Sequence, residues 1–474
     1  MRAGRRSDDD AIPMADASVF HIAVIGSGPG GFYATEALLR SGTPVAVDMF
    51  EQLPVPYGLV RFGVAPDHPR LKQVTTAFDR IAAMPGFRFI GGVSAGRDVS
   101  IDELRDSYDA VILATGADVS RSLGIPGEEL AGSHSAGDFV AWYNGHPDYR
   151  DVHFDLDCEA VTIIGHGNVA LDVARILAKT ADELRRTDIA GHALEALSKS
   201  RVRDIHVVGR GTPAQARFSS KELREFLELQ ACDPSIDGRD VTMGDFAAEN
   251  PHDPELIEKL SLLRAFSQAS PTKPRRCIFR FGLSPIVIRG RSGVEAIAFA
   301  QQASGGVENI DCGLVFRSVG RRTAPLAGVP YDDRRGVHAN IEGRVVLDSA
   351  VIAGLYACGW SKRGPSGTIG TNRACGLATA QAVLADLPVH ALRRSGNPDT
   401  LLAQLRSRVG RIVSYADWAA IDAAEKRRGV PLGKPREKFV SVPKLLAAAN
   451  ACPGPGCHRT VISGANAPSG DPAC

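Results

Sequence analysis

The chain has 474 residues, a length that predicts about two or three domains. Its 44% hydrophobic and 23% charged residues are ordinary for a globular protein, which excludes a coiled coil, a collagen and a wholly disordered chain. Lys and Arg total 55 against 54 Asp and Glu, so the net charge of +1 gives no general attraction for nucleic acid. We therefore expect no nucleic-acid partner, and a charged partner must meet a local patch.

The longest apolar stretches, such as 22–25 and 110–114, have the length of strands. They are much shorter than the roughly 18 to 20 apolar residues that a helix needs to span a bilayer. The polar N-terminus carries acids at 8–10, unlike a secretory signal or a mitochondrial presequence. Nine scattered cysteines do not suggest a disulfide framework. These features predict a cytoplasmic protein without a membrane span, with residues 1–18 as a loose leader.

Regular structure is first expected at Phe20. Residues 20–26 have the pattern of a buried strand, 26–42 of a turn and a helix ending at Gly42, and 44–51 of a second strand. A later strand at 108–116 ends in a small-residue turn and closes this first βαβ unit.

A weak repeat of this pattern follows. Residues 159–165 predict a strand, 166–180 an amphipathic helix, 188–200 an extra helix and 203–211 the next strand. The alternation over 278–320 predicts a small antiparallel sheet appended to this second unit.

The part of the chain after Pro330 is expected to return to the first unit. It shows a pair of strands up to Trp360, then a Gly-rich turn at Gly364–Gly370 that opens a helix. The positive end of that helix is suited to the electron-rich edge of a reduced flavin. The remainder is mostly helical until residues 451–474, which are rich in Gly and Pro and predicted to be a disordered tail.

The first motif is Gly26-Ser27-Gly28-Pro29-Gly30-Gly31, a G-x-G-x-x-G sequence between a strand and a helix. Its first glycine permits a tight turn, the second lets backbone amides approach a pyrophosphate, and the third lets the helix pack close to the strand. Glu51 ends the next strand, where a carboxylate accepts both ribose hydroxyls. The motif therefore predicts a dinucleotide with a free 2′-hydroxyl.

The second motif, Gly165–Ala170, is the same fingerprint with Ala in the last place. Here the following strand ends in Arg210, which favours a ribose with a 2′-phosphate, although a solvated surface charge is the alternative. Two sites with opposite charge preferences predict FAD and NADP(H) as the two cofactors.

The cysteines bear on the electron acceptor. No C-x-x-C dithiol of a disulfide reductase is present, and no group of about four cysteines could hold an iron–sulfur cluster. We therefore expect the one-electron carrier to be a separate protein, and we expect no metal site.

Four segments carry a family resemblance: 26–31, 51–72, 165–177 and 357–373. Together they resemble the adrenodoxin reductase-like ferredoxin–NADP+ reductases, over about residues 20 to 445. The resemblance implies an α/β fold with two Rossmann-like dinucleotide-binding domains. An NADP-binding domain, 120–330, would be inserted into a discontinuous FAD-binding domain of residues 19–119 and 331–450. It also implies electron transfer from NADPH through FAD to a ferredoxin-type, adrenodoxin-like iron–sulfur protein.

The resemblance also implies roles for individual residues. His68 and Glu225 would relay a proton during flavin reduction. The family usually has paired arginines where this chain has Arg210-Gly211, so one contact to the 2′-phosphate is missing. The FAD contacts would be Gly26, Gly28, Pro29, Gly30, Gly31, Glu51, Leu59, Trp360, Gly367, Thr368 and Ile369, and the NADP contacts Arg121, His166, Gly167, Asn168, Val169, Arg210 and Glu222.

Several residues also have structural interpretations. Ser219 and Glu222 match a helix capping box, Trp360 could belong to the core, and His68 could be a turn residue. At the level of function, the alternatives are reduction of a quinone or another small acceptor, and a non-catalytic nucleotide-binding redox scaffold. Candidate basic patches for an acidic ferredoxin are Lys273 with Arg275 and Arg276, Arg289 with Arg291, and Arg321 with Arg322.

Overall fold

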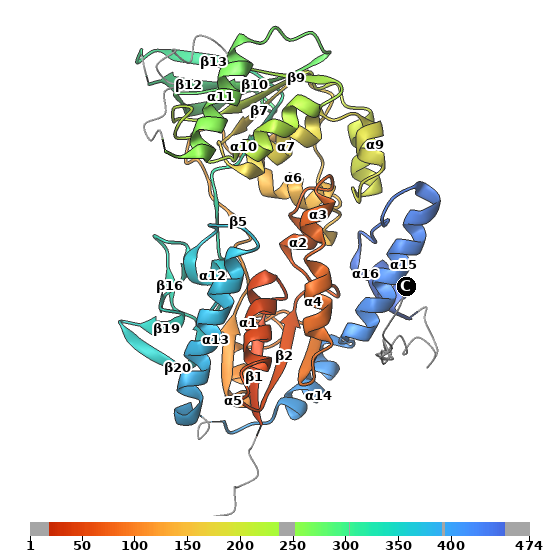
Figure 1. Cartoon of the computed structure of the whole chain (residues 1–474), viewed down its shortest axis with the longest axis vertical. Coiled ribbons are helices and arrows are strands. Elements are labelled where there is room, and N and C mark those ends of the chain that lie inside the picture. Colours follow the sequence, from red (N-terminus) through yellow and green to blue (C-terminus); the bar gives the residue numbers. More distant parts are fainter. Residues whose placement is uncertain (1–18, 237–251, 303, 391–393, 451–474) are drawn as a thin grey trace, which may run out of the picture.

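The computed structural model describes residues 19–236, 252–302, 304–390 and 394–450. The expected leader, 1–18, and the expected tail, 451–474, lie outside these residues. Figure 1 shows two bodies stacked along the long axis of the molecule. The lower body is built on a seven-stranded sheet and the upper body on a six-stranded sheet.

The seven-stranded sheet has the order β18-β19-β20-β4-β1-β2-β3. Strands β1, β2, β3 and β4 are parallel, and β20 joins them parallel to β4. Strand β19 runs antiparallel to β20, and β18 antiparallel to β19. The C-terminal part of the chain thus completes the sheet that the N-terminal part begins. The bounds are β1 (Phe20–Ile25), β2 (Val45–Glu51), β3 (Phe87–Gly91), β4 (Ala110–Leu113), β18 (Asn340–Ile341), β19 (Arg344–Leu347) and β20 (Ala350–Ala357).

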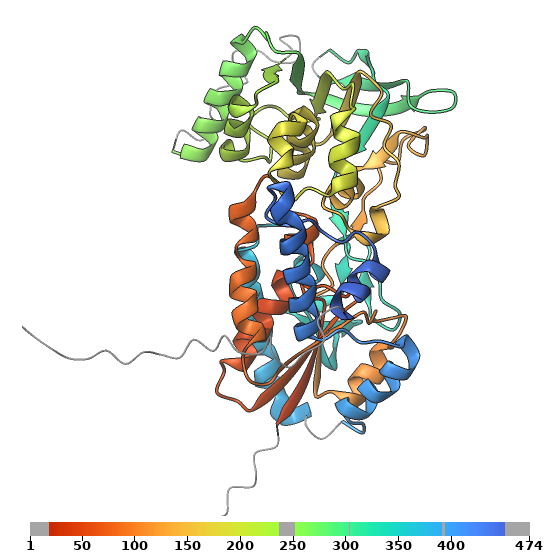
Figure 2. The ribbon, with the colours of Figure 1, turned by 90° about the vertical axis from the view of Figure 1, so that its right-hand side faces the viewer.

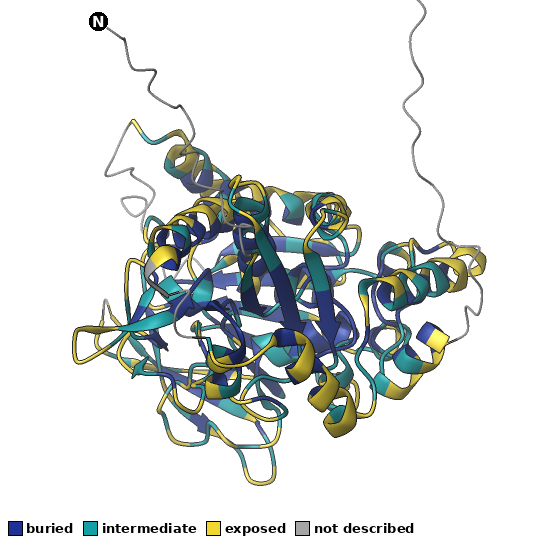
Figure 3. Ribbon diagram, turned by 90° about the horizontal axis from the view of Figure 1, so that it is seen from below, coloured by how far each residue is buried: buried dark blue, intermediate teal, exposed yellow. Residues whose placement is uncertain are grey.

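Helices cover both faces of this sheet because its central strands are buried along nearly their whole length. In Figure 3 the strands at the centre are dark blue, and the helices around them carry the exposed residues. Helix α1 ends at Leu39, three residues before the expected Gly42, which lies in the following turn with φ +82°. The helices are α1 (Pro29–Leu39), α4 (Thr75–Ala82), α5 (Ile101–Ser107), α12 (Trp360–Arg363), α13 (Thr371–His390), α14 (Pro398–Val409), α15 (Tyr415–Gly429) and α16 (Val442–Asn450).

The six-stranded sheet has the order β6-β14-β7-β8-β10-β9 and is parallel throughout. The expected extra helix is present as α9, with the short α8 before it. The strands are β6 (Ser133–Ser135), β7 (Ala160–Ile164), β8 (Asp204–Val208), β9 (Cys232–Ile236), β10 (Arg275–Arg280) and β14 (Leu314–Arg317). The helices are α6 (Ala136–Tyr143), α7 (Asn168–Ala178), α8 (Ala181–Arg185), α9 (Gly191–Ser198), α10 (Ser220–Arg224) and α11 (Pro254–Gln268).

The prediction of one antiparallel sheet over 278–320 is only partly right. Strands β11 (Leu283–Arg289), β12 (Ala296–Gln301) and β13 (Val307–Asp311) form it, but β10 and β14 belong to the parallel sheet. Arg280 misled the pattern because it is buried and pairs with Glu308 at 2.7 Å instead of facing solvent. A buried arginine with an ion-pair partner thus gave the appearance of a solvent-facing position.

A ribbon of β5 (Val119–Ser120) and β15 (Arg321–Arg322) links the two bodies. A second connection is the segment with α2 (Leu59–Phe62) and α3 (Pro69–Lys72), which rises from the lower body toward α6. Figure 2 shows the C-terminal helices, in blue, beside these N-terminal helices, and Arg61 on α2 binds Glu425 on α15 at 2.6 Å. Among the described residues, no helix is both long and apolar enough to cross a membrane.

Candidate functional site

The first Gly-rich loop joins β1 to α1 with the geometry that its sequence predicts. Gly26 has φ +104° and its N–H donates to the Phe50 carbonyl at 2.8 Å. A Cβ on Gly31 would lie 2.1 Å from the Gly26 carbonyl oxygen, so a larger residue does not fit there. A Cβ on Gly28, the N-cap of α1, would meet nothing within 4 Å, and no side chain caps this helix. The loop therefore offers open space and free amides at a positive helix end, which suits a pyrophosphate.

Glu51 lies at the end of β2, beside this loop. Its Oε2 accepts hydrogen bonds from the Ser27 hydroxyl at 2.6 Å and the Ser27 N–H at 3.2 Å, and its Oε1 accepts from the Leu53 N–H at 3.1 Å. Burial raises the pKa of Glu51, and these hydrogen bonds oppose that shift. The carboxylate is thus held in one orientation next to the loop.

Two other segments contact the first loop. The Tyr57 N–H donates to the Ser27 carbonyl at 3.1 Å, and a Cβ on Gly58 would lie 3.3 Å from the Cα of Gly28, which places Leu59 next to the loop. From the C-terminal part, Gly359 is so close that a Cβ on Gly30 would lie 3.3 Å from its Cα. Trp360 follows directly and begins α12.

The expected C-terminal turn precedes α13. The Trp360 indole N–H donates to the Ser366 carbonyl at 3.2 Å, so the side chain is bound to the turn and is only half-buried, not a core residue. The Thr368 carbonyl accepts from the side chains of Thr371 and Asn372. Gly367 and Thr368 are exposed and Ile369 is half-buried, so this turn is accessible beside Trp360.

Two buried cysteines lie behind the first loop, although no C-x-x-C spacing signals them. The Cys358 thiol donates to the Gly30 carbonyl at 3.4 Å, and the Cys375 sulfur accepts from the Gly359 N–H at 3.2 Å. The Cys358 thiol and this N–H lower the pKa of Cys375 to about 5, while the pKa of Cys358 is raised well above its usual value. The two sulfurs therefore pack the loop against the C-terminal segment.

The second Gly-rich loop joins β7 to α7. The Gly165 N–H donates to the Val208 carbonyl at 2.8 Å, and a Cβ there would lie 2.2 Å from the Ser318 carbonyl oxygen. A Cβ on Gly167, the N-cap of α7, would meet nothing within 4 Å, as at Gly28. The Val169 side chain is 46% exposed at the start of the helix. This loop therefore has the same open shape as the first.

The side chain of His166 turns toward the protein. Its ring packs against Phe218 and Phe281, and Nε2 lies 3.2 Å from the Val207 carbonyl oxygen. Burial lowers the pKa of His166 to about 4, so the ring is neutral at physiological pH. Only the backbone of this expected NADP contact is thus available to a nucleotide.

Arg210 stands two residues beyond the end of β8, beside the second loop, and is exposed. Arg121 follows β5 directly, where its N–H donates to the Gly320 carbonyl at 3.0 Å and its guanidinium to the Arg335 carbonyl at 3.2 Å. Of the two cations, Arg210 has no hydrogen bond or ion pair with a described residue. It is therefore the one free to meet an anion.

The capping box expected at Ser219 and Glu222 is half formed. The Ser219 hydroxyl accepts from the Glu222 N–H at 3.3 Å, but the Ser219 N–H donates to the Asn168 side chain at 3.0 Å. The Glu222 carboxylate instead accepts from Arg175 at 3.3 Å. Asn168 thus ties the second loop to α10, and Glu222 faces a charge cluster.

That charge cluster joins the two bodies. His68 Nε2, from the lower body, lies 2.7 Å from Glu225 Oε2 in the upper body. Arg175 on α7, whose side chain is 1% exposed, binds Asp67 through Nε at 2.7 Å and also contacts Asp172, Glu222 and Glu225. Lys179 adds a contact to Asp67 at 3.2 Å. The structure therefore brings the two predicted catalytic residues together, within a network that spans the interface.

The cluster holds four carboxylates against two permanent cations, Arg175 and Lys179. Burial opposes the charged form of His68, but its hydrogen bond to Glu225 and the nearby acids Asp172 and Asp67 outweigh burial and raise its pKa. Burial also disfavours the charged form of Glu225, yet His68 and Arg175 lower its pKa. The surplus of negative charge thus favours a protonated His68.

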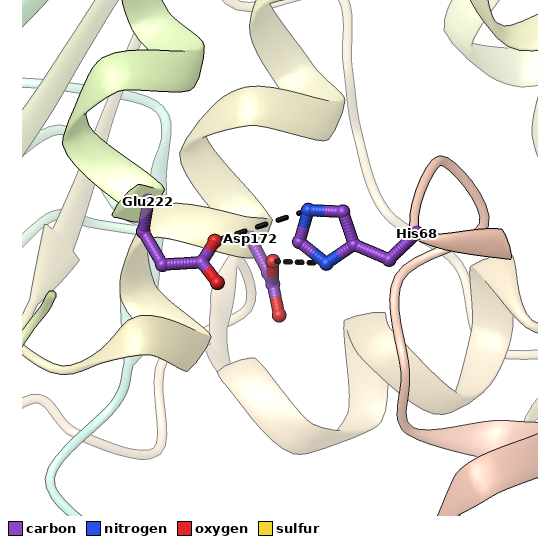
Figure 4. A group of neighbouring side chains, drawn as sticks. All are labelled: His68, Asp172 and Glu222. Atoms are coloured by element: carbon purple, nitrogen blue, oxygen red, sulfur yellow. Dashed lines mark ion pairs between the residues drawn. The ribbon is translucent and has the colours of Figure 1, made fainter. Parts of the chain in front are cut away.

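His68, Asp172 and Glu222 each place one ligand atom within 4.8 Å of the others, as Figure 4 shows. The His68 ring faces both carboxylates from one side, with Nδ1 4.0 Å from Asp172 and Nε2 3.9 Å from Glu222. Arg175 already binds both acids. We therefore interpret the group as an ion-pair network.

The expected patch of Lys273, Arg275 and Arg276 is not a free docking surface, and in the patch of Arg321 and Arg322 only Arg322 is exposed. Arg275 donates to three carbonyls at the C-terminal end of α7, Arg276 binds Asp204 through two nitrogens, and Lys273 binds Asp233. Arg321 donates to the Asp118 carbonyl and is only half-buried. These cations serve internal contacts, whereas Arg289 and Arg291 are exposed and pair with no described residue through their side chains.

Comparisons with known proteins agree with this geometry. Residues 20–231 match the model of the pyridine nucleotide-disulphide oxidoreductase family. The NADPH:adrenodoxin oxidoreductase of Salvelinus fontinalis is 39% identical, over 91% of each chain, and the NADPH-ferredoxin reductase FprA of Mycobacterium tuberculosis is 40% identical, over 90% of this chain and 98% of its own. A structure of the latter in complex with NADPH superposes with a TM-score of 0.85, covering 91% of this chain and all of that one.

The chain belongs to the adrenodoxin reductase-like family of ferredoxin–NADP+ reductases. The family resemblance and the α/β fold with two Rossmann-type units are thus confirmed. In this family member, the characteristic 51–72 segment carries Asp67, His68 and Lys72 to the upper body, so it forms the interface between the two sheets.

Sequence reasoning missed the residues at the centre of the charge cluster. Arg175, Asp67 and Asp172 carry no local motif, and a single arginine has little weight in a chain so rich in arginine. It also missed Arg217, whose backbone N–H donates to the His166 carbonyl at 2.8 Å. The signal that could have found Arg175 is its apolar helix face, where a charge is costly unless it has a partner.

Proposed function

We propose that this reductase binds FAD at the first loop and NADP(H) at the second, and passes electrons from NADPH to a ferredoxin-type iron–sulfur protein. The proposal rests on a difference between the two Gly-rich loops, which have the same backbone shape but different neighbouring side chains. The strand after the first ends in the carboxylate of Glu51, and the strand after the second is followed by the free guanidinium of Arg210. A carboxylate suits an unmodified ribose and a guanidinium suits a 2′-phosphate.

The residues around the first loop fit FAD. The open space at Gly28 and the uncapped end of α1 accept the pyrophosphate, and Glu51 accepts hydrogen bonds from the ribose. Leu59, Trp360 and the turn with Gly367, Thr368 and Ile369 surround the side where the flavin ring would lie. Bound FAD would take up a hydride from NADPH and release its electrons one at a time.

The residues around the second loop fit NADP(H) in the same way. Gly167 leaves room for the pyrophosphate at the start of α7, and Asn168 and Val169 are exposed there. Arg210 supplies charge for the 2′-phosphate, while Arg121 and Glu222 complete the proposed contacts. We place the NADP-binding domain at 120–330 and the FAD-binding domain at 19–119 and 331–450.

We assign the proton relay to His68 and Glu225. Their 2.7 Å hydrogen bond crosses between the two bodies, and the surrounding acids keep a proton on His68. His68 would hold this proton near the flavin and Glu225 would orient the ring. Because both residues sit at the interface, the relay forms only when the two bodies are in contact.

For the acceptor, relatives of this chain are named as reductases of adrenodoxin and ferredoxin. Arg289 and Arg291 remain as exposed cations for an acidic partner. We place the enzyme in the cytoplasm, because its nine cysteines are scattered along the sequence, as is typical of a protein from a reducing compartment.

The experiment is a reduction assay under argon. NADPH should bleach the flavin promptly, and a [2Fe–2S] ferredoxin should then be reduced far faster than a quinone. A faster quinone rate would favour the small-acceptor alternative, and an unbleached flavin would favour the non-catalytic scaffold. Ferredoxin reduction should also slow with added salt, whereas the rate with ferricyanide should not.

A further inference from the structure

Arg217 is a second exposed arginine at the second Gly-rich loop. Its N–H donates to the His166 carbonyl at 2.8 Å, and the next residue, Phe218, donates to the same oxygen at 3.0 Å. Two hydrogen bonds to one carbonyl fix the position of this backbone against the loop. Arg217 is thus attached to the residue that follows the first glycine of the motif.

The residue before Arg210, Gly209, packs against the ring of the same histidine. Gly209 lies so close to His166 that a Cβ on it would be 2.3 Å from Nδ1 of the ring. Between the two arginines the chain turns back, because Gln215 exchanges hydrogen bonds with Thr212, through its side chain at 3.2 Å and its N–H at 3.1 Å. The turn brings Arg217 back to His166, next to which Gly209 and Arg210 also lie.

Both guanidinium groups are available for a ligand. Arg210 and Arg217 are exposed, and within the described parts of the chain neither forms a side-chain hydrogen bond or an ion pair. Three other arginines of the upper body, Arg175, Arg276 and Arg280, bind carboxylates instead. Among the described residues, Arg210 and Arg217 are therefore two unpaired cations that border an anion-binding loop.

We infer that Arg217 acts with Arg210 as a pair that binds the 2′-phosphate of NADP(H), and so contributes to the choice of NADPH over NADH. This inference rests on the proposed function and deepens it. A phosphate monoester carries about −1.5 to −2 charges at pH 7, so one arginine neutralises only part of it. A second guanidinium restores the paired contact that the Arg210-Gly211 sequence lacks.

The test compares Arg217→Ala and Arg210→Ala with a matched control, Arg203→Ala. Arg203 is also exposed, but it precedes β8, at the strand end opposite Arg210. We expect each site variant to lower kcat/KM for NADPH about tenfold, with ferricyanide as acceptor, and to leave NADH nearly unchanged. The double variant should use the two nucleotides almost equally, and Arg217→Lys should lose less than Arg217→Ala.

A binding measurement tests the same inference without requiring catalytic turnover. Calorimetric titration with adenosine 2′,5′-bisphosphate should show a loss of affinity of about tenfold for Arg217→Ala, and titration with 5′-AMP should show none. If Arg217→Ala has the same kcat/KM for NADPH and the same affinity for adenosine 2′,5′-bisphosphate as Arg203→Ala, the inference is wrong. The proposed function would still stand in that case, because it is tested by the activity of the wild type. Wild-type protein whose flavin is not reduced by NADPH would instead overturn the proposed function.

Discussion

The two Gly-rich loops of this protein share one backbone design and differ in what surrounds it. In both, the first glycine abuts a carbonyl and the N-cap glycine faces open space. The first loop is enclosed by Glu51, Gly58 and Gly359, from segments on either side of the inserted upper body. The second is bordered by exposed arginines. In the proposed assignment, the shared loop shape serves the pyrophosphate, whereas the residues around each loop select the nucleotide and set how firmly it is held.

The largest expected effect separates the two loops directly. Gly28→Ala should fold but lose FAD, because its new methyl group would occupy the space proposed for the pyrophosphate. Gly167→Ala should keep FAD and lose NADPH binding. Flavin absorbance after gel filtration and NADPH titration measure the two losses.

Steric controls for that experiment lie in the same loops. Gly31→Ala and Gly165→Ala place a methyl group about 2 Å from a carbonyl oxygen, so they should destabilise the fold itself, by roughly 1 to 3 kcal/mol. If Gly28→Ala retained FAD and Gly167→Ala lost it, the proposed assignment of the loops would be reversed.

The second largest effect concerns the helices that follow the loops. Helix α7 carries the buried Arg175 into the interface between the bodies. Arg175→Met should destabilise the protein by about 3 to 5 kcal/mol, because Asp67 would be left buried without its main partner. Scanning calorimetry measures the change. Lys199→Met, which removes an exposed pair with Glu195, is the control and should change stability by less than about 1 kcal/mol.

The third prediction tests whether Glu51 binds FAD directly. Glu51→Gln should weaken FAD retention by roughly 1.5 to 3 kcal/mol, the value of a hydrogen bond to a charged group. Dialysis followed by flavin fluorescence measures it, with the exposed Glu195→Gln as control. Full, undialysable FAD in the Glu51 variant would argue that the carboxylate only supports Ser27.

The smallest effect is a pH dependence at the interface. Because the folded pKa of His68 is raised, its contribution to stability is complete below about pH 6.5 and is lost as pH rises through the folded value. Wild type should therefore exceed His68→Gln in stability by more at pH 6 than at pH 9. Thermal melts across that range measure the difference, and a constant gap would contradict a proton held on His68.

Local patterns were enough to predict much of the fold. The strands at 20–26 and 159–165, the helices after them and the charges of Glu51 and Arg210 follow from periodicity and motif spacing, which the tertiary structure leaves unchanged. Helix ends were less well predicted, as at Leu39, because capping depends on contacts outside the helix.

The sequence by itself determined the two nucleotide loops, because each is built from consecutive residues whose backbone requirements are local. Only the tertiary structure decided that β10 and β14 join the parallel sheet, that Arg175 binds Asp67 across the two bodies, and that Arg217 returns to His166. These features join residues far apart in sequence or separated by an irregular turn. Their free energy comes from burial, backbone hydrogen bonds and an ion pair between segments, which no local pattern records.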